Sequence, residues 1–291
     1  MKVVVIGKNG QLAWELARLN TEQVEVVCLG REQIDITGNV SLEKTLSALK
    51  PDAVINAAVY TAVDLAEKEK DVAYLINATA VGNLAQVCSQ LSLHFVHVST
   101  DFVFSGESGI PYLPNDEYSP LGVYGASKAE GEKLIAEILP EQGCIIRTSW
   151  VYSSHGQNFV KTMLKLMEEK PELGIISDQI GSPTYAKGLA EACLYAACNS
   201  VTGIHHWTDA GVASWYDFAV AIQEIGLSLQ LLNKEIPIRA ISTKDYPTPA
   251  KRPSYSVLDK TSLAEVFSGL PLVHWRVQLN KMMKELTINR L

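Results

Sequence analysis

Five short apolar runs divide the first half of the chain. They lie at 3–6, 24–29, 53–55, 95–98 and 144–146. Between them, apolar residues recur at helical spacing over 11–19, 41–49, 72–91 and 124–139. Wholly apolar strands that alternate with helices are typical of a parallel sheet with helices on both faces. The pattern therefore predicts an α/β fold built on a doubly wound, Rossmann-type parallel sheet.

The second half of the chain has a looser pattern. Helical spacing occurs near 158–169 and 189–197 and from Ser214 onward, and short apolar runs occur at 173–176, 204–207 and 238–241. Five of the twelve prolines fall between 237 and 271, which indicates irregular structure there. We expect residues 1–150 to form the Rossmann domain and residues 151–291 to form mainly a smaller lobe. The segments 184–208 and 238–244 are expected to return to the first domain.

Composition and charge narrow the classes of protein that fit this chain. The net charge of −7 argues against general binding to nucleic acid or to an anionic membrane. The first apolar run is too short for a signal peptide or a membrane span, so we expect a cytoplasmic protein. The five cysteines form no CxxC pair and are expected to be buried thiols. His205 and His206 would point to opposite sides of a strand, so no metal site is predicted.

A glycine loop joins the first apolar run to the first helical segment. Gly7, Gly10 and Ala13 follow the spacing G-x-x-G-x-x-A, a variant of the dinucleotide-binding fingerprint. Gly7 suits a tight turn, Gly10 lets the backbone approach a pyrophosphate, and Ala13 allows a helix to pack closely on the sheet. A simple glycine turn is the alternative. The position directly after the first strand favours NAD(P) binding by the domain of residues 1–150.

A charged turn follows the second apolar run. A carboxylate at this strand end usually binds the ribose hydroxyls of NAD, whereas an arginine suits the 2′-phosphate of NADP. Arg31 therefore indicates NADPH as the cofactor, and the neighbouring Glu32 leaves NADH open. A solvated surface turn is the alternative interpretation of both side chains.

Three residues in the middle of the chain fit proton-transfer chemistry. Tyr124 and Lys128 are four residues apart on one face of a predicted helix, and Thr100 follows a strand at the edge where open α/β sheets bind ligands. A phenol with a pKa of about 10 is a poor acid near neutrality. An ammonium at Lys128 is expected to lower the pKa of Tyr124. Thr100 is expected to hydrogen-bond a substrate oxygen.

At these residues the chain resembles the extended short-chain dehydrogenase/reductase superfamily and, within it, the dTDP-4-dehydrorhamnose reductase family. The resemblance rests on the order and spacing of many short motifs spread over nearly the whole chain. The motifs are 7–12 with 14–16, 56–58 with 61–64, Ser99-Thr100-Asp101, Tyr124 with Lys128, 147–152, 158–159, 178–179 with 181–184, and 246–250 with 252–253.

The resemblance implies a role for individual residues. It implies a catalytic triad of Thr100, Tyr124 and Lys128. The positions implied for the cofactor, in addition to Tyr124 and Lys128, are Gly7, Gly10, Gln11, Leu12, Arg31, Asp35, Ile36, Ala57, Ala58 and Tyr60. The positions implied for a dTDP-sugar substrate, in addition to Thr100, are Asp101, Trp150, Asn158, Phe159 and Arg252, of which Arg252 is assigned to the diphosphate. For Trp150 and Phe159, a place in the hydrophobic core is the alternative.

The sequence departs from the family pattern in two places. Phe102 stands where a tyrosine is frequent after Ser-Thr-Asp, which removes a hydroxyl without changing the triad. Some members of the family have dimers bridged by a metal through carboxylates that include the equivalent of Glu15 and one near the end of the chain. Residues 287–291 contain no side-chain carboxylate, so we expect no bound metal and leave a homodimer open.

The resemblance implies reduction of the C4 ketone of dTDP-4-dehydro-6-deoxy-L-mannose to dTDP-L-rhamnose, for cell-surface polysaccharides such as O-antigen. One alternative is another nucleotide-sugar reductase, epimerase or dehydratase, although the Thr-Asp-Glu sequence typical of 4,6-dehydratases is replaced here by Thr100-Asp101-Phe102. A regulatory subunit that binds the cofactor without catalysis is the other alternative. The intact Thr100, Tyr124 and Lys128 argue against it.

Overall fold

The computed structural model describes residues 1–288, and a six-stranded sheet is its main feature. All neighbouring strands are parallel, in the order β10-β5-β4-β3-β1-β2. The strands are β1 (Lys2–Ile6), β2 (Glu25–Leu29), β3 (Ala53–Asn56), β4 (His94–Thr100), β5 (Gly143–Thr148) and β10 (Gly203–His206). The predicted doubly wound parallel sheet is confirmed. The order of the strands reverses between β1 and β3, and such a point opens a crevice at the carboxyl ends of the strands.

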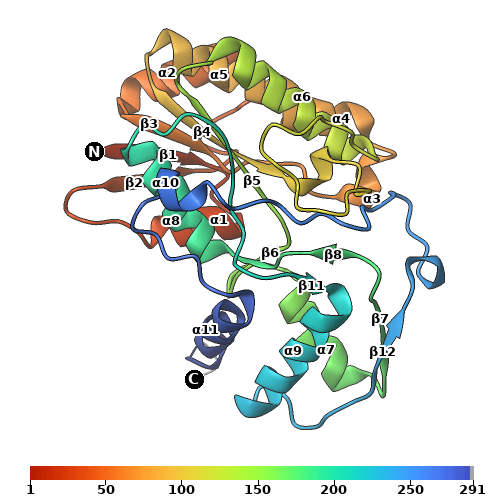
Figure 1. The fold of residues 1–291 in the computed structure, drawn as a ribbon. Helices are drawn as coiled ribbons and strands as arrows, with labels where there is room; N and C mark the ends of the chain where they lie inside the picture. Colours follow the sequence, from red (N-terminus) through yellow and green to blue (C-terminus); the bar gives the residue numbers. More distant parts are fainter. Residues whose placement is uncertain (289–291) are drawn as a thin grey trace.

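Helices cover both faces of this sheet (Figure 1). One face is covered by α1 (Gln11–Ala17) and α8 (Ala186–Cys198), and the other by α2 (Asn39–Leu49), α5 (Ala80–Gln90) and α6 (Val123–Ile138). Side chains alternate along a strand, so β1 serves two cores. Val3 and Val5 pack in the core under α1 and α8, whereas Val4 and Ile6 pack in the core under α2 and α5. Both faces are buried, which explains why β1 is apolar from Val3 to Ile6.

The predicted helix 72–91 is interrupted in the structure. After α3 (Val63–Ala66), the chain forms α4 (Lys70–Tyr74), then a π-helical turn (Leu75–Thr79), and then α5. The buried side chain of Asn77, in this π-helical turn, points toward the loop after β3. Its side-chain oxygen accepts a hydrogen bond from Tyr60 N at 2.9 Å. Its amide nitrogen donates to Tyr60 O at 3.1 Å. The π turn thus fixes the backbone of a loop at the edge of the sheet.

The smaller lobe contains three main helices around an aromatic core. They are α7 (Phe159–Glu169), α9 (Trp215–Ser228) and α11 (Trp275–Ile288), with the short α10 (Leu263–Val266) leading back along the large domain. Short strands pair as β6 (Val151–Tyr152) with β9 (Thr184–Tyr185), β7 (Leu173–Ile176) with β12 (Ile238–Ile241), and β8 (Ile180–Gly181) with β11 (Ala213–Ser214). Within residues 1–288, no helix has the length and apolar character needed to cross a membrane.

The two segments that were expected to return to the first domain behave differently. The segment 184–208 contains α8, which packs on α1, and β10, which pairs with β5 at the edge of the six-stranded sheet. The segment 238–244 does not return, so that part of the prediction is wrong. Its strand β12 pairs with β7 in the smaller lobe. The sequence of so short a strand does not specify which strand it pairs with.

Candidate active site

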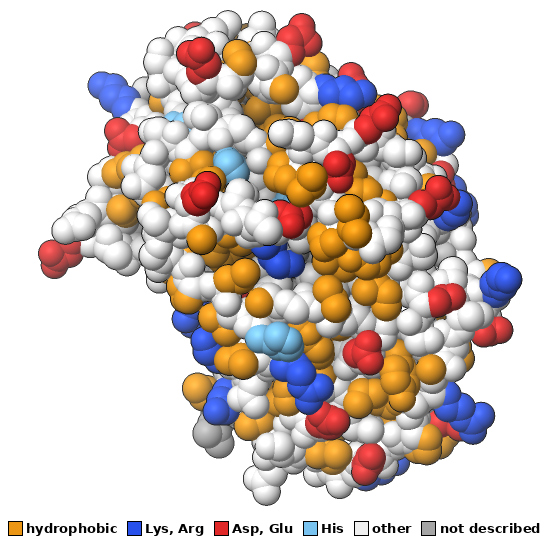
Figure 2. Space-filling model, in the orientation of Figure 1, with side chains coloured by type: hydrophobic (Ala, Val, Ile, Leu, Met, Phe, Trp, Pro, Cys, Tyr) orange, Lys and Arg blue, Asp and Glu red, His pale blue; other side chains and the backbone are white. Residues whose placement is uncertain are grey.

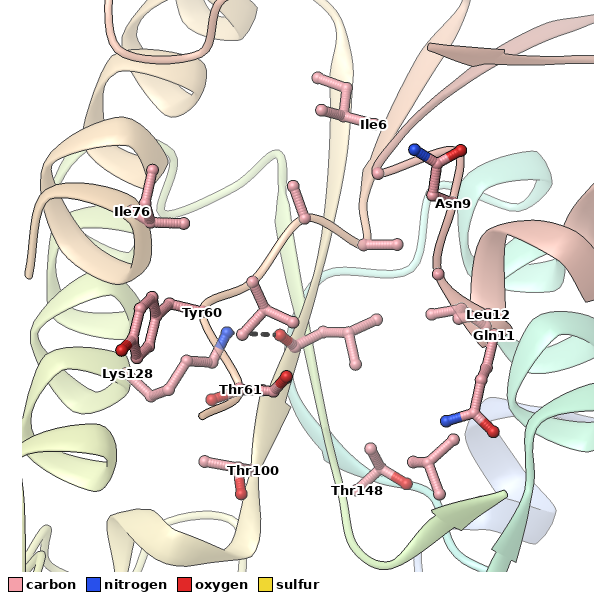
Figure 3. A pocket seen from close by; sticks show the side chains of 18 of the residues that line it. Ile6, Asn9, Gln11, Leu12, Tyr60, Thr61, Ile76, Thr100, Lys128 and Thr148 are labelled. Atoms are coloured by element: carbon pink, nitrogen blue, oxygen red, sulfur yellow. Dashed lines mark hydrogen bonds between the residues drawn. The ribbon is translucent and has the colours of Figure 1, made fainter. Parts of the chain in front are cut away.

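A cavity of about 1120 Å³ lies at the carboxyl ends of the central strands. It is lined by the glycine loop after β1, the ends of β2, β3 and β4, and the start of α6. Figure 3 shows Tyr60 and Lys128 on one side of this space and Asn9, Gln11 and Leu12 on the other. The cavity brings together these residues proposed from the sequence: Gly7, Gly10, Gln11, Leu12, Arg31, Asp35, Ile36, Ala57, Ala58, Tyr60, Thr100, Asp101, Tyr124, Lys128 and Trp150.

The glycine loop has the geometry of a backbone cradle. Gly7 has φ +110°, and a Cβ there would lie 2.8 Å from the backbone of Ala57 and Ala58. Only glycine therefore fits between β1 and the loop after β3. Gly10 precedes α1 in an extended conformation, and no side chain caps the helix. The N–H groups of the first turn consequently remain available to an anionic group in the cavity.

At the end of β2, one acidic side chain forms an ion pair and one basic side chain forms none with the described residues. Glu32 forms an ion pair with Lys8 at 3.8 Å, and its carboxylate folds back over Gly30. Arg31 is exposed, lines the cavity and has no ion pair within residues 1–288. The carboxylate next to Arg31 is thus engaged, while the guanidinium is available for a phosphate. Basic and acidic side chains are interspersed over the face of the molecule that Figure 2 shows.

Thr100 and Tyr124 meet where β4 ends and α6 begins. The Thr100 hydroxyl donates to Asp101 Oδ1 at 3.0 Å and accepts from Phe102 N at 3.2 Å. The ring of Phe102 packs edge-on against Tyr124, with 5.6 Å between ring centroids. A Cβ on Gly125 would lie 2.1 Å from Phe102 O, so this glycine lets α6 approach the end of β4. The departure at Phe102 therefore supplies packing for Tyr124 in place of a hydroxyl.

Lys128 lies one helical turn after Tyr124 and points toward β4. Its Nζ donates to Val98 O at 2.7 Å and lies 2.9 Å from His97 Nε2 (Figure 3 draws the first contact). Burial lowers the pKa of Lys128 to about 7 and raises that of Tyr124 to about 12, with Thr100 opposing the second shift. The expectation that an ammonium at Lys128 lowers the pKa of Tyr124 is therefore wrong for this structure. Burial is the largest cause of both shifts, and Lys128 is not among the groups that shift the pKa of Tyr124.

The substrate positions inferred from the resemblance do not all reach the cavity. Trp150, with φ +49°, lines it and stacks on Trp215 with 3.6 Å between ring centroids. Phe159 does not line the cavity and packs against Trp215 in the core of the smaller lobe. Asn158 caps α7 through Lys161 N and donates to Gln11 Oε1 at 2.9 Å. Asn158 itself is absent from the cavity lining, whereas its partner Gln11 is part of it.

Arg252 is engaged elsewhere. Its guanidinium donates to both carboxylate oxygens of Asp64 on α3, at 2.7 and 3.1 Å. Ala250 N also donates to Asp64, at 3.1 Å, and Arg252 is absent from the cavity lining. The structure thus uses Arg252 to tie the segment after β12 to the large domain. Burial raises the pKa of Asp101, the remaining inferred substrate position, to about 6.

The chain is similar to known proteins over nearly its whole length. The model of the RmlD substrate binding domain family matches residues 1–288. The chain belongs to this family.

Relatives of the RmlD family match over nearly their full length. The Bacillus subtilis spore coat polysaccharide biosynthesis protein SpsK is 42% identical, over 98% of this chain and 97% of that protein. The dTDP-4-dehydrorhamnose reductase of Escherichia coli K12 is 38% identical, over 98% of both chains. The crystal structure of a dTDP-4-dehydrorhamnose reductase from Bacillus anthracis in complex with NADP has a TM-score of 0.91 at 34% identity, over 98% of this chain and 99% of that one.

The RmlD-family chain has further cavity residues that the sequence reasoning missed. Thr61, Val63, Thr148 and Trp215 line the cavity in addition to the residues proposed above. Trp215 is the largest of them, and its only local signal was the helix start at Ser214. That serine forms a capping box with Asp217, which fixes the first turn of α9 and places Trp215 at the cavity.

The carboxylates considered for a metal bridge in this family form a cluster with an arginine. Glu15 is buried and accepts from Ser153 at 2.7 Å, while Arg18 lies 3.7 Å from Glu15 and 3.1 Å from Glu285. Glu285 thus supplies a carboxylate just before 287–291, the segment that contains none. Residues 289–291 of that segment lie outside the described residues. Between residues 1 and 288, no three His, Cys, Asp or Glu side chains are grouped so as to hold a metal ion.

Proposed function

We propose that this RmlD-family chain is an NADPH-dependent dTDP-4-dehydrorhamnose reductase. It reduces the C4 ketone of dTDP-4-dehydro-6-deoxy-L-mannose and forms dTDP-L-rhamnose. The observation that carries the proposal is one cavity that combines the glycine cradle with Thr100, Tyr124 and Lys128. Full-length relatives named dTDP-4-dehydrorhamnose reductase, at 36–40% identity, support the choice of substrate. They and the spore coat relative support a place in cell-surface polysaccharide biosynthesis.

The residues at the cradle fit a dinucleotide. A Cβ at Gly7 would clash with the backbone of Ala57 and Ala58, so this tight loop needs glycine, and the first turn of α1 lacks a cap. Arg31, Asp35, Ile36, Ala57, Ala58 and Tyr60 line the continuation of the same cavity. The NADP complex of the Bacillus anthracis relative supports the choice of cofactor. We assign Arg31 to the 2′-phosphate, because it is the cation at the end of β2 without a carboxylate partner.

The chemistry divides between cofactor and protein. NADPH, when bound, supplies the hydride for C4 of the sugar. The Tyr124 phenol gives its proton to the oxygen that becomes the C4 hydroxyl, and its raised pKa keeps it protonated at neutral pH. Thr100 holds the same oxygen by a hydrogen bond. Asp101 and Trp150 are proposed to contact the sugar, because both line the cavity beside Thr100.

Further features bear on the location of the enzyme and on the type of reaction. All five cysteines are free, which is typical of a reducing compartment, and we place the enzyme in the cytoplasm. The likeness to a Thermus thermophilus UDP-glucose 4-epimerase, at 17% identity and a TM-score of 0.81, concerns the fold alone. The geometry at Thr100-Asp101-Phe102 contains no glutamate for an elimination, so it favours a reductase over a dehydratase.

The test is a direct assay with the purified chain. The 4-dehydro sugar nucleotide is offered with NADPH and, separately, with NADH, and the product is identified by NMR. We expect oxidation of NADPH together with formation of dTDP-L-rhamnose. A folded protein that binds NADPH and leaves the ketone unreduced would contradict the proposal.

A further inference from the structure

A chain of hydrogen bonds runs beneath the proposed active site. Ala58 N donates to Asn56 Oδ1 at 3.1 Å, and Asn56 Nδ2 lies 3.1 Å from His97 Nδ1. His97 Nε2 in turn lies 2.9 Å from Lys128 Nζ. Asn56, His97 and Lys128 are each no more than 1% exposed. The proposed function gives no role to Asn56 or His97.

The donor and acceptor roles along this chain of hydrogen bonds follow from the backbone N–H of Ala58. A backbone N–H can only donate, so Ala58 fixes Asn56 with its oxygen toward the loop and its amide nitrogen toward His97. His97 Nδ1 must therefore accept. Burial in the interior holds the pKa of His97 well below its usual value, so the ring is neutral. A neutral ring that accepts at Nδ1 carries its proton on Nε2.

The proton on His97 Nε2 faces Lys128. A donor at 2.9 Å needs a lone pair on the other atom, and an ammonium group has none. An amine has one lone pair and two protons, of which one goes to Val98 O at 2.7 Å. We propose that Asn56 and His97 are positioning residues that hold Lys128 as a neutral amine.

The charged groups around Lys128 agree with this assignment. Glu132, one turn further along α6, is the carboxylate that favours an ammonium, but its oxygens are engaged by Arg147 at 2.7 to 3.1 Å. Asp101, across the site on the loop after β4, accepts from Thr100. Tyr124, on the same helix, is a neutral phenol. Within residues 1–288, no carboxylate forms an ion pair with Lys128. Burial lowers the pKa of Lys128 to about 7, in the same direction.

The consequence for catalysis rests on the proposed reductase function. Loss of the Tyr124 proton to the sugar oxygen leaves a phenolate. A neutral amine at Lys128 can balance that charge only after it takes up one proton from solvent, which converts the amine to an ammonium. His97 must then lose its hydrogen bond to Nζ or change its tautomer. The buried pair thus makes the charge on Lys128 conditional instead of permanent.

Nuclear magnetic resonance of the wild-type protein, without cofactor or substrate, tests the inference. The ¹⁵N shifts of the His97 ring, assigned by their loss in His97→Gln, should show a proton on Nε2 and none on Nδ1. The ¹³Cε signal of Lys128, assigned by its loss in Lys128→Met, should titrate near neutral pH, roughly three pH units below an ordinary lysine. A proton on Nδ1, or titration together with the other lysines, would overturn the inference. Neither readout depends on turnover, so absence of ketone reduction would count against the proposed function alone.

A substitution at Asn56 should reverse the donor and acceptor roles along this chain of hydrogen bonds. In Asn56→Asp, the carboxylate accepts from Ala58 N–H and from His97 Nδ1–H, which leaves Nε2 to accept from a Lys128 ammonium. We expect the ring proton to move to Nδ1 and the Lys128 titration midpoint to rise by more than one pH unit. Asn83→Asp, the same change on α5, should alter neither value. An unchanged tautomer in Asn56→Asp would overturn the inference, and if that variant fails to fold, the wild-type tautomer decides.

Discussion

Burial shifts the protonation of Tyr124 and Lys128 in opposite directions. The pKa of the phenol is raised to about 12, and that of the amine is lowered to about 7. The phenol is therefore held in its uncharged form across the neutral range, whereas the lysine changes between ammonium and amine within that range. For a reduction this is useful, because the phenol is in the state that can donate a proton.

Removal of the phenol hydroxyl should abolish that donation. In Tyr124→Phe we expect kcat to fall by about 10²–10⁴, with the dissociation constant for NADPH nearly unchanged. Steady-state kinetics and fluorescence titration measure the two quantities. Tyr195→Phe is the matched control, because it loses a hydroxyl that bonds Ser268 and neither residue lines the cavity. Near-normal turnover in a folded Tyr124→Phe protein would reject Tyr124 as the donor.

Arg31 decides between the two cofactors if its assignment is correct. Arg31→Ala should weaken NADPH binding by about 1–3 kcal/mol, as expected for a hydrogen bond to a charged group, and should leave NADH binding unchanged. Isothermal titration calorimetry with each cofactor measures this difference, and NADH serves as the internal control. Equal losses for both cofactors would assign Arg31 to some other part of the dinucleotide.

Asp101 makes a pH-dependent contribution to stability. Burial raises the folded-state pKa of Asp101 to about 6, above the ordinary 3.8. A raised pKa means that the folded protein binds the proton more tightly, so this contribution is complete below pH 4 and is lost as the pH rises through 6. The free energy of unfolding of wild type relative to Asp101→Asn should therefore fall by about 2 kcal/mol between pH 4.5 and pH 7.5. Urea unfolding across that range measures it, and a constant difference would contradict the prediction.

At the scale of elements, the sequence predicted the strands that are buried on both faces. The runs 3–6 in β1, 53–55 in β3 and 144–146 in β5 are apolar because helices cover them on either side, and that pattern is local to each strand. The partners of an element depend on distant residues and leave no such pattern. β12, which contains the exposed Arg239, was expected to return to the first domain, yet it pairs with β7 in the smaller lobe. The π turn at Leu75–Thr79 was missed because its cause, the Tyr60 loop held by Asn77, lies outside the helix.

The same limit applies to the candidate site. The glycine loop and the Tyr124–Lys128 spacing are local patterns, and the structure brings both to one cavity. Trp215 could not be assigned, since an aromatic residue at a helix start has no local mark of a cavity. Arg252 was assigned to a phosphate because of its charge, whereas its observed partner Asp64 is 188 residues earlier in the chain.

The pair of Arg252 with Asp64 allows a test of two roles. If Arg252 binds the substrate diphosphate when substrate is present, Asp64 competes for it. Arg252→Ala should then raise KM at least tenfold with little change in kcat, and Asp64→Asn should lower KM or leave it unchanged. If Arg252 only ties the segment after β12 to α3, both variants should raise KM by similar factors. Steady-state kinetics at saturating NADPH separates these outcomes.

At the scale of the whole molecule, the large domain is completed by residues from the second half of the chain. One face of the sheet is covered by α1 together with α8, and the buried cluster there includes Leu189, Cys193 and Trp207. Phe267, later still, packs in the same cluster. β10 covers the outer edge of β5. The Rossmann domain is thus continuous in space but not in sequence.

A fragment of residues 1–150 should therefore lack a stable fold. It would expose the face that α8 covers and the edge that β10 covers, and large exposed apolar faces are not tolerated in an isolated domain. We expect binding of the dye ANS and no cooperative unfolding in urea. A fragment of residues 1–208, which regains α8 and β10, should be the more compact of the two. Cooperative unfolding of the shorter fragment would show that residues 1–150 suffice.

The late position of β10 in the sequence also determines how long one edge of β5 stays unpaired while the chain is synthesised on the ribosome. Synthesis adds roughly 5–20 residues per second, and everything from β6 to α8 must be made between β5 and β10. Throughout that interval β5 offers an open strand edge, the kind of surface that pairs with other chains and aggregates. A translational pause just after β5 should therefore lower the yield of native protein more than a pause just after β10.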